Sequence, residues 1–226
     1  MSASTGSAVL PGSTLLAYPD FVKRCDVVLA SKSPRRKEIF EMMGLAQTRI
    51  IVSTFAEDFD KSLFPEPGEY ARASAQKKAE EIALQVLPNA TGPTVVVGSD
   101  TIVDLNGRIL EKPDGEEGAF NMLRDLSGQQ HKVHSGVAIY TQACGPEAPA
   151  KAFYTTTTVS FSHLTDEEIN EYIKTGEPMD KAGAYGIQGI GGQFVAELTG
   201  SYFNVMGFPM REFSVALGDL IKAGKV

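Results

Sequence analysis

The sequence is poor in the residues that build metal centres and disulfide frameworks. Its 226 residues include two cysteines, Cys25 and Cys144, and three histidines, and neither set has the spacing of a metal-binding motif. Because the cysteines are far apart along the chain, we expect two reduced thiols of the kind found in cytosolic proteins. This scarcity argues against a zinc module and against a scaffold stapled by disulfides.

Long apolar runs and an excess of positive charge are also missing. No segment approaches the roughly 20 apolar residues that a transmembrane helix needs, so we expect a soluble protein without a membrane partner. The chain has 28 Asp and Glu against 21 Lys and Arg, a net charge of −7. Since duplex binding relies on a broad basic surface, this balance argues against a nucleic-acid partner, although it leaves room for a small, locally basic pocket.

The first 20 residues contain no charged side chain before Asp20 and are rich in Ser, Gly and Ala. A secretory signal needs a basic start and a sustained apolar stretch, and a transit peptide needs arginines. Neither pattern is present, so we predict a flexible tail over residues 1–22 and a cytoplasmic location. Hydrophobic residues make up 42% of the chain, which is enough for the core of a single domain over residues 23–226.

Hydrophobic patterning predicts strands and helices that alternate along the chain. The expected strands cover residues 26–30, 48–52, 94–97, 102–110 (a hairpin around an Asn-Gly turn), 130–140, 151–161 and 194–198. The expected helices cover residues 34–43, 69–87, 114–128 and 210–221, with another that follows a capping box at residues 165–168. No internal repeat or linker divides this region, so we predict one α/β fold with an elongated mixed sheet flanked by helices.

Two arginines lie at the predicted start of a helix, where the macrodipole is already positive. In the stretch SKSPRR, Arg35 and Arg36 occupy the first turn, which destabilises a free helix by a few tenths to about 1 kcal/mol. An anion bound at this helix end would reverse the sign of that effect. Arginine offers a rigid fork of donors to phosphate oxygens, and Ser31 and Ser33 add hydroxyls. The alternative is a solvated basic turn paired with surface acids.

Asp100, Lys112 and Glu57 are candidates for the same opening, and Lys78 is a charged misfit in a predicted helix. Asp100 follows a strand that should end at residue 97, and open α/β sheets bind ligands at that edge. Lys78 interrupts the apolar stripe of the long helix, Lys112 ends the hairpin, and Glu57 could supply a second metal-binding oxygen. Such a set suits Mg²⁺-assisted attack on a phosphoanhydride. The alternatives are a turn residue at Asp100 and a lysine at position 78 that snorkels to solvent.

A glycine-rich segment, DKAGAYGIQGIGG at residues 180–192, is the candidate for binding a flat ligand. Glycine permits close approach of the backbone, and Gln188 presents a donor and an acceptor side by side, which matches the edge of a pyrimidine base. Taken on the residues alone, the favoured interpretation is a connector with Tyr185 as a core residue.

These stretches, in this order, resemble the Maf family of nucleotide pyrophosphatases, also described as septum-formation inhibitor proteins. The matching motifs, within residues 26–222, are LASKSPRR, VVGSDTIV, ILEKP, LSGQQHKVHSGVAI, DKAGAYGIQGIGG and NVMGFPM. The resemblance implies the elongated α/β fold shared with inosine-triphosphate pyrophosphatases. It also implies metal-assisted hydrolysis of a nucleoside triphosphate to the monophosphate and pyrophosphate.

The resemblance further implies a role for each charged candidate. Asp100 would be the proton acceptor, with Lys78 and Lys112 beside it. Glu57 and Asp100 would bind a divalent cation, Mg²⁺ or Mn²⁺. The residues implied to hold the phosphates are Ser33, Arg35, Arg36, Lys78 and Lys112. The resemblance also admits a homodimer.

Substrate preference is implied by three details of the motifs. Thr101 after the Asp, Glu111 before the Lys and the YGIQ run are similar to the branch that acts on dTTP and UTP, and modified pyrimidine nucleotides are further candidate substrates. The branch that takes methylated GTP usually has Gln after the Asp and lacks that run. Arg36, Thr101 and Gln188 are then the implied specificity positions. Two alternatives stay open: a broad house-cleaning enzyme for non-canonical nucleotides, and a regulator of cell division that binds nucleotides without turnover.

Overall fold

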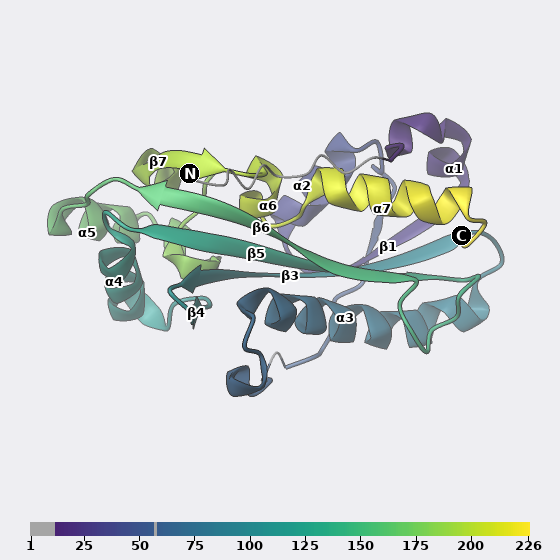
Figure 1. The fold of residues 1–226 in the computed structure, drawn as a ribbon, viewed down its shortest axis with the longest axis horizontal. Coiled ribbons are helices and arrows are strands. Elements are labelled where there is room, and N and C mark those ends of the chain that lie inside the picture. Colours follow the sequence, from purple (N-terminus) through teal and green to yellow (C-terminus); the bar gives the residue numbers. More distant parts are fainter. Residues whose placement is uncertain (1–11, 57) are drawn as a thin grey trace, which may run out of the picture.

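The computed structural model describes residues 12–56 and 58–226 and contains a seven-stranded mixed sheet (Figure 1). The strand order is β2-β1-β3-β5-β6-β7, with β4 paired to β3. The strands are β1 (Asp26–Ala30), β2 (Arg49–Ile50), β3 (Thr94–Leu105), β4 (Arg108–Leu110), β5 (Gln130–Thr141), β6 (Lys151–Phe161) and β7 (Val195–Thr199). β1 is parallel to β2 and β3, and the other pairings are antiparallel. The predicted elongated α/β architecture is confirmed.

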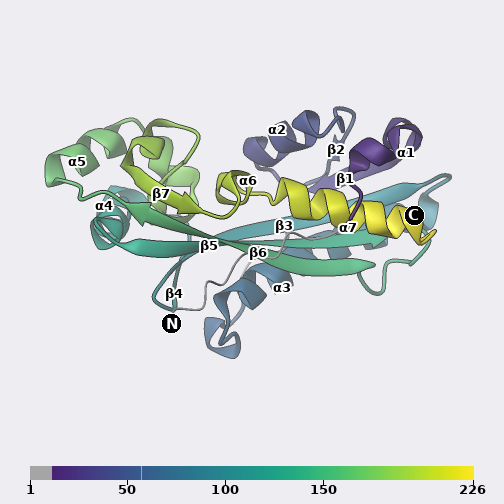
Figure 2. The same cartoon turned by 45° about the horizontal axis from the view of Figure 1, so that its top comes forward.

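Helices cover both faces of this sheet. They are α1 (Pro19–Arg24), α2 (Pro34–Met42), α3 (Pro67–Val86), α4 (Gly115–Leu126), α5 (Asp166–Lys174), α6 (Tyr202–Met206) and α7 (Met210–Lys222). α3 runs along one face and α7 along the other (Figure 1), and α2 and α6 lie on the α7 side (Figure 2). The β-branched run that starts β3 is buried because its side chains alternate between these two layers: Val95 and Val97 pack toward α7, and Val96 packs toward α3.

The remaining turns of helix are short 3-10 segments: η1 (Leu15–Ala17), η2 (Lys61–Leu63), η3 (Leu87–Asn89), η4 (Glu177–Asp180), η5 (Ala182–Ala184) and η6 (Ile190–Phe194). Three of them, η4 to η6, form the glycine-rich region. No helix within the described part of the chain is both long enough and apolar enough to cross a bilayer.

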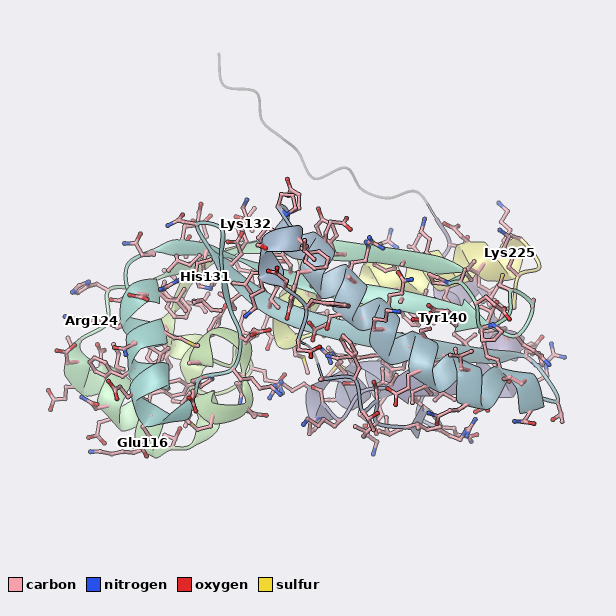
Figure 3. All side chains as sticks on the ribbon, turned by 90° about the horizontal axis from the view of Figure 1, so that it is seen from below. Glu116, Arg124, His131, Lys132, Tyr140 and Lys225 are labelled. Carbon is pink, nitrogen blue, oxygen red and sulfur yellow. The ribbon has the colours of Figure 1, made fainter. Side chains whose placement is uncertain are left out.

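Two glycines let the backbone of α3 approach the sheet. A Cβ atom on Gly98 of β3 would lie far inside van der Waals contact of the Ala75 carbonyl oxygen, and one on Gly136 of β5 would meet the Ala71 carbonyl in the same way. Only glycine leaves this space, so α3 packs backbone against backbone here. Figure 3, seen from the α3 side, shows this helix crossing the sheet beside Tyr140 of β5.

β3 is longer than the sequence pattern predicts. The expected strand ends at residue 97, with Asp100 beyond it, whereas β3 continues to Leu105. The reason is its partner: β5 pairs with β3 without interruption from Val95 to Asp104. On the other edge, β1 pairs with β3 only as far as Gly98, and β4 pairs with β3 only from Val103 onward. Among the described residues, positions 99–102 therefore have no strand neighbour on that edge.

Part of the tail predicted over residues 1–22 forms helical turns in the structure. Residues 12–22 include η1 and the start of α1, and Leu15 is buried against α7, where its backbone N–H donates to Ser214 Oγ at 2.9 Å. The apolar side chains around Leu15 explain this packing, since their burial stabilises the segment on the core. Residues 1–11 lie outside the described residues.

Candidate functional site

A cavity of about 780 Å³ opens at the edge of the sheet, between the start of α2, the middle of β3 and the glycine-rich region. Nine of the residues singled out from the sequence line it, although they come from five separate segments: Ser31, Ser33, Arg35, Arg36, Lys78, Asp100, Thr101, Lys112 and Gln188. Glu57 lies outside the described residues. The structure thus brings the candidates together, while the role of each stays a prediction.

Asp100 and Thr101 reach this cavity from opposite faces of β3, because successive strand residues alternate. Asp100 points toward α3, and Thr101 points toward the turn between α6 and α7, where its hydroxyl donates to the Gly207 carbonyl at 3.1 Å. Both line one cavity because residues 99–102 have no neighbouring strand on that edge among the described residues. The break in strand pairing between β1 and β4 therefore forms the site.

Lys78 and Asp100 form a buried ion pair at this break. Lys78 Nζ donates to Asp100 Oδ1 at 2.8 Å, and each side chain is only 10% exposed. Charges this buried are tolerated because they are paired. Lys78 therefore does not snorkel to solvent: it lies in the apolar stripe of α3 because its partner is on the sheet beneath.

Arg36 is held by the fold. It is buried, and its Nε, Nη1 and Nη2 donate to the Gly207 carbonyl at 2.9 Å, to Ser31 Oγ at 2.8 Å and to Thr101 Oγ1 at 3.1 Å. Charge-assisted bonds of this kind are roughly twice as strong as neutral ones. They offset the macrodipole cost of a cation at the start of α2, so Arg36 does not itself require a bound anion. It ties α2 to β3 and to the turn after α6.

Arg35, in contrast, lies at the mouth of the cavity. Its Nη1 pairs with Asp180 Oδ2 at 3.2 Å, and Lys181 Nζ donates to the other oxygen of that carboxylate at 2.7 Å. Burial opposes ionisation of Asp180, but the hydrogen bond from Lys181 and the charges of Arg35 and Lys181 outweigh it, so its pKa is lowered. This bridge joins α2 to the glycine-rich region.

The start of α2 adds further donors. Ser33 is the N-cap residue of α2, and its side chain makes no capping hydrogen bond within the described residues. The first N–H groups of a helix have no partner within the helix, and together with the Ser33 hydroxyl they suit an anion. The exposed Lys112 also lines the cavity, next to Glu111, whose carboxylate accepts hydrogen bonds from Tyr70 and Lys61 at 2.8 and 2.6 Å.

Gln188 and Tyr185 occupy different environments within the glycine-rich region. Tyr185 is buried against Phe161, with ring centroids 4.7 Å apart, and its hydroxyl bonds to His131 Nε2 at 2.9 Å. It is a core residue, as interpreted from the sequence, although it also borders the cavity. Gln188 is exposed at the rim and donates from Nε2 to Glu38 Oε2 at 3.3 Å.

Residues 26–220 match the model of the family described as Maf-like protein. The chain belongs to the Maf-like family.

Three curated relatives of this Maf-like chain are highly similar over most of its length. A dTTP/UTP pyrophosphatase of Clostridium novyi is 44% identical over 197 residues, which are 86% of this chain and 97% of that protein. Another, of Clostridium perfringens strain SM101, is 42% identical and is covered to 95%. A human protein named "Probable bifunctional dTTP/UTP pyrophosphatase/methyltransferase protein" is 44% identical over 198 residues. The chain spans 32% of the length of that human protein.

The solved structures include a nucleoside-triphosphatase, dITP/XTP pyrophosphatase, from Mycobacterium abscessus that matches 88% of this Maf-like chain and 96% of its own. Its sequence identity is 15% and its TM-score is 0.35, values too low to support a conclusion about this protein.

The carboxylate chemistry of the Maf-like cavity suits a metal ion that arrives with a phosphorylated ligand. Within the described residues, no three His, Cys, Asp or Glu side chains gather as metal ligands. Mg²⁺ is commonly held by one or two carboxylates, with phosphates and water completing its shell, and Asp100 supplies one buried carboxylate. The donor set therefore fits Mg²⁺ or Mn²⁺, and metal binding stays a prediction.

Four charged residues at the cavity were not among the sequence candidates for binding or catalysis. They are Lys32, Glu111, Asp180 and Lys181. Each lies inside a motif that carried the family resemblance, so the signal was present. Only the structure shows that Asp180, which also accepts a hydrogen bond from Lys181, pairs with Arg35, 145 residues earlier in the chain.

Proposed function

We propose that this Maf-like protein hydrolyses dTTP and UTP to the monophosphate and pyrophosphate. The observation that carries the proposal is the meeting of nine polar residues from five segments around one cavity, among them the buried Lys78–Asp100 pair. Relatives at 42–44% identity are named dTTP/UTP pyrophosphatase, which supports the same assignment.

In the proposed reaction, the triphosphate lies across the start of α2. Arg35, Ser33 and the helix N–H groups hold its oxygens from one side, and Lys112 holds them from the other. Because Arg35 already forms an ion pair with Asp180, the incoming phosphate either displaces that carboxylate or binds Arg35 beside it.

Asp100 then accepts a proton from a water molecule, whose oxygen bonds to the α-phosphorus. The bond from that phosphorus to the bridging oxygen breaks, and pyrophosphate leaves with the electron pair. Lys78 keeps the carboxylate in place throughout. A divalent cation, which Asp100 and Glu57 would hold, supplies charge neutralisation on the phosphate oxygens.

Base recognition is proposed for Thr101 and Gln188, with Arg36 as the residue that orients Thr101. An amide that bonds the uracil edge rejects cytosine, because donor and acceptor are exchanged between the two bases at positions 3 and 4. Each polar group left unpaired costs roughly 1–3 kcal/mol.

A panel of nucleoside triphosphates, assayed for released pyrophosphate with and without Mg²⁺ or Mn²⁺, tests the function. We expect turnover of dTTP and UTP above that of CTP and the purine nucleotides. Asp100→Asn should lower the rate by about 10²–10⁴-fold, the usual contribution of a general base. Near-normal turnover in this variant would refute the role of Asp100. Equal rates on all bases would instead indicate a house-cleaning enzyme, and tight binding without pyrophosphate would indicate a regulator.

A further inference from the structure

Gln188 can distinguish uracil from cytosine only if its amide is held in one orientation. The oxygen and the NH₂ group of a carboxamide have nearly the same shape but opposite hydrogen-bonding roles. In one orientation the oxygen accepts from N3–H of uracil or thymine and the NH₂ group donates to O4. Rotated by 180°, the same side chain donates to N3 of cytosine and accepts from its amino group. A freely rotating glutamine would therefore recognise both bases.

The structure contains a group that removes this ambiguity. Gln188 Nε2 donates to Glu38 Oε2 at 3.3 Å. An ionised carboxylate only accepts hydrogen bonds, so the rotated amide would place its oxygen against another acceptor. The NH₂ group has two hydrogens, and one of them stays available for the base when the other bonds to Glu38.

Glu38 is well placed for this role because its own helix is anchored. It lies in α2, whose first turn is tied to β3 and to Gly207 through two hydrogen bonds of Arg36. The backbone position of Glu38 is therefore set by the same helix that borders the cavity.

The backbone that carries Gln188 is fixed from the other side by Glu177. The carboxylate of Glu177 accepts from the backbone N–H groups of Ile190 and Gly191, at 2.9 and 3.1 Å, and from the Tyr172 hydroxyl at 2.8 Å. The Tyr172 hydroxyl in turn accepts from the N–H of Gly186 at 3.2 Å. The backbone is thus held on both sides of Gln188, between residues 186 and 191. What remains to be fixed is the orientation of the Gln188 amide, and Glu38 is the group that bonds to it.

We infer that Glu38 is a positioning residue that sets base preference by orienting the Gln188 amide. This inference rests on the proposed function, in which Gln188 reads the pyrimidine edge. It assigns a specificity role to a residue of α2 that need not touch the nucleotide.

The test compares kcat/KM for UTP and for CTP in variants at position 38. Glu38→Ala removes the carboxylate that accepts from the Gln188 amide. We expect the UTP:CTP ratio of kcat/KM to fall about tenfold, the effect of roughly one hydrogen bond to a charged group. Glu38→Lys replaces an acceptor with a donor that attracts the amide oxygen. The amide then rotates by 180°, which directs its NH₂ group toward N3 of the base. It should lower the ratio further and raise the rate on CTP itself.

Two controls separate orientation from charge. Glu41→Lys makes the same change of charge one turn further along α2, where Glu41 pairs with Lys37 at 3.6 Å, and it should leave the ratio unchanged. In a Gln188→Ala background, which should itself lose UTP:CTP discrimination, Glu38→Lys should have no further effect on the ratio.

The outcomes distinguish this inference from the proposed function. A parent protein that releases no pyrophosphate from UTP would refute the function. An active parent whose ratio is the same in Glu38→Ala and Glu38→Lys would refute the inference alone. So would a change in the ratio that persists without Gln188, because Glu38 would then act through its charge and not through the amide.

Discussion

Loss of the Lys78 charge should destabilise the protein, because it leaves Asp100 as an unpaired buried carboxylate. In Lys78→Met the apolar stem is kept, but Asp100 loses its partner at 2.8 Å, and both side chains are only 10% exposed in the parent. Breaking a buried ion pair from one side costs about 3–5 kcal/mol. Because Asp100 borders a cavity that admits water, we expect about 3 kcal/mol of lost unfolding free energy.

Urea denaturation followed by far-ultraviolet circular dichroism measures this loss, since the chain has no tryptophan for fluorescence. The neighbouring Lys77→Met is the matched control: Lys77 is half exposed and pairs with Glu80 on the surface, so it should cost about 0–1 kcal/mol.

A double variant, Lys78→Met with Asp100→Asn, removes both charges. It should be more stable than the sum of the two single changes implies, by at least about 1.5 kcal/mol, because Asp100 is then no longer an unpaired buried charge. The reasoning is refuted if Lys78→Met is as stable as Lys77→Met, or if the two single changes simply add.

Two further predictions concern the packing that positions the site. Gly136→Ala should lower the free energy of unfolding by about 1–3 kcal/mol through overpacking against the α3 backbone, and it should lower activity by moving Lys78 away from Asp100. The control Gly92→Ala, whose position has open space around it, should do neither. Equal melting curves for the two variants would contradict the close contact at Gly136. Leu15→Ala should lower the free energy of unfolding by about 2 kcal/mol or more. The adjacent Leu16 is 90% exposed, so Leu16→Ala should not change stability. Equal urea midpoints for the two variants would show that η1 does not stabilise the core.

Local patterns were sufficient for most helices and strands, because their apolar residues recur with the period of the element. The capping box at Thr165, for example, is formed as expected. The extent of β3 could not be predicted in this way. Gly98, Ser99 and Asp100 have the composition of a turn, yet pairing with β5 carries the strand through them.

The sequence by itself determined the chemistry that this protein brings to its site: two arginines at a helix start, a lysine in an apolar stripe, an aspartate within GSDT and a glutamine among glycines. Each is a local property of residue type and spacing, and each can be seen without coordinates.

Only the tertiary structure decided what these groups do to one another. Arg36 bonds to a carbonyl 171 residues away, Lys78 pairs with Asp100 across α3 and β3, and Glu38 accepts a hydrogen bond from an amide 150 residues further on. Hydrogen bonds and ion pairs act over about 3 Å, so which groups interact depends on where the sheet places them. The break between β1 and β4 does this by leaving one edge of β3 open to both faces of the sheet.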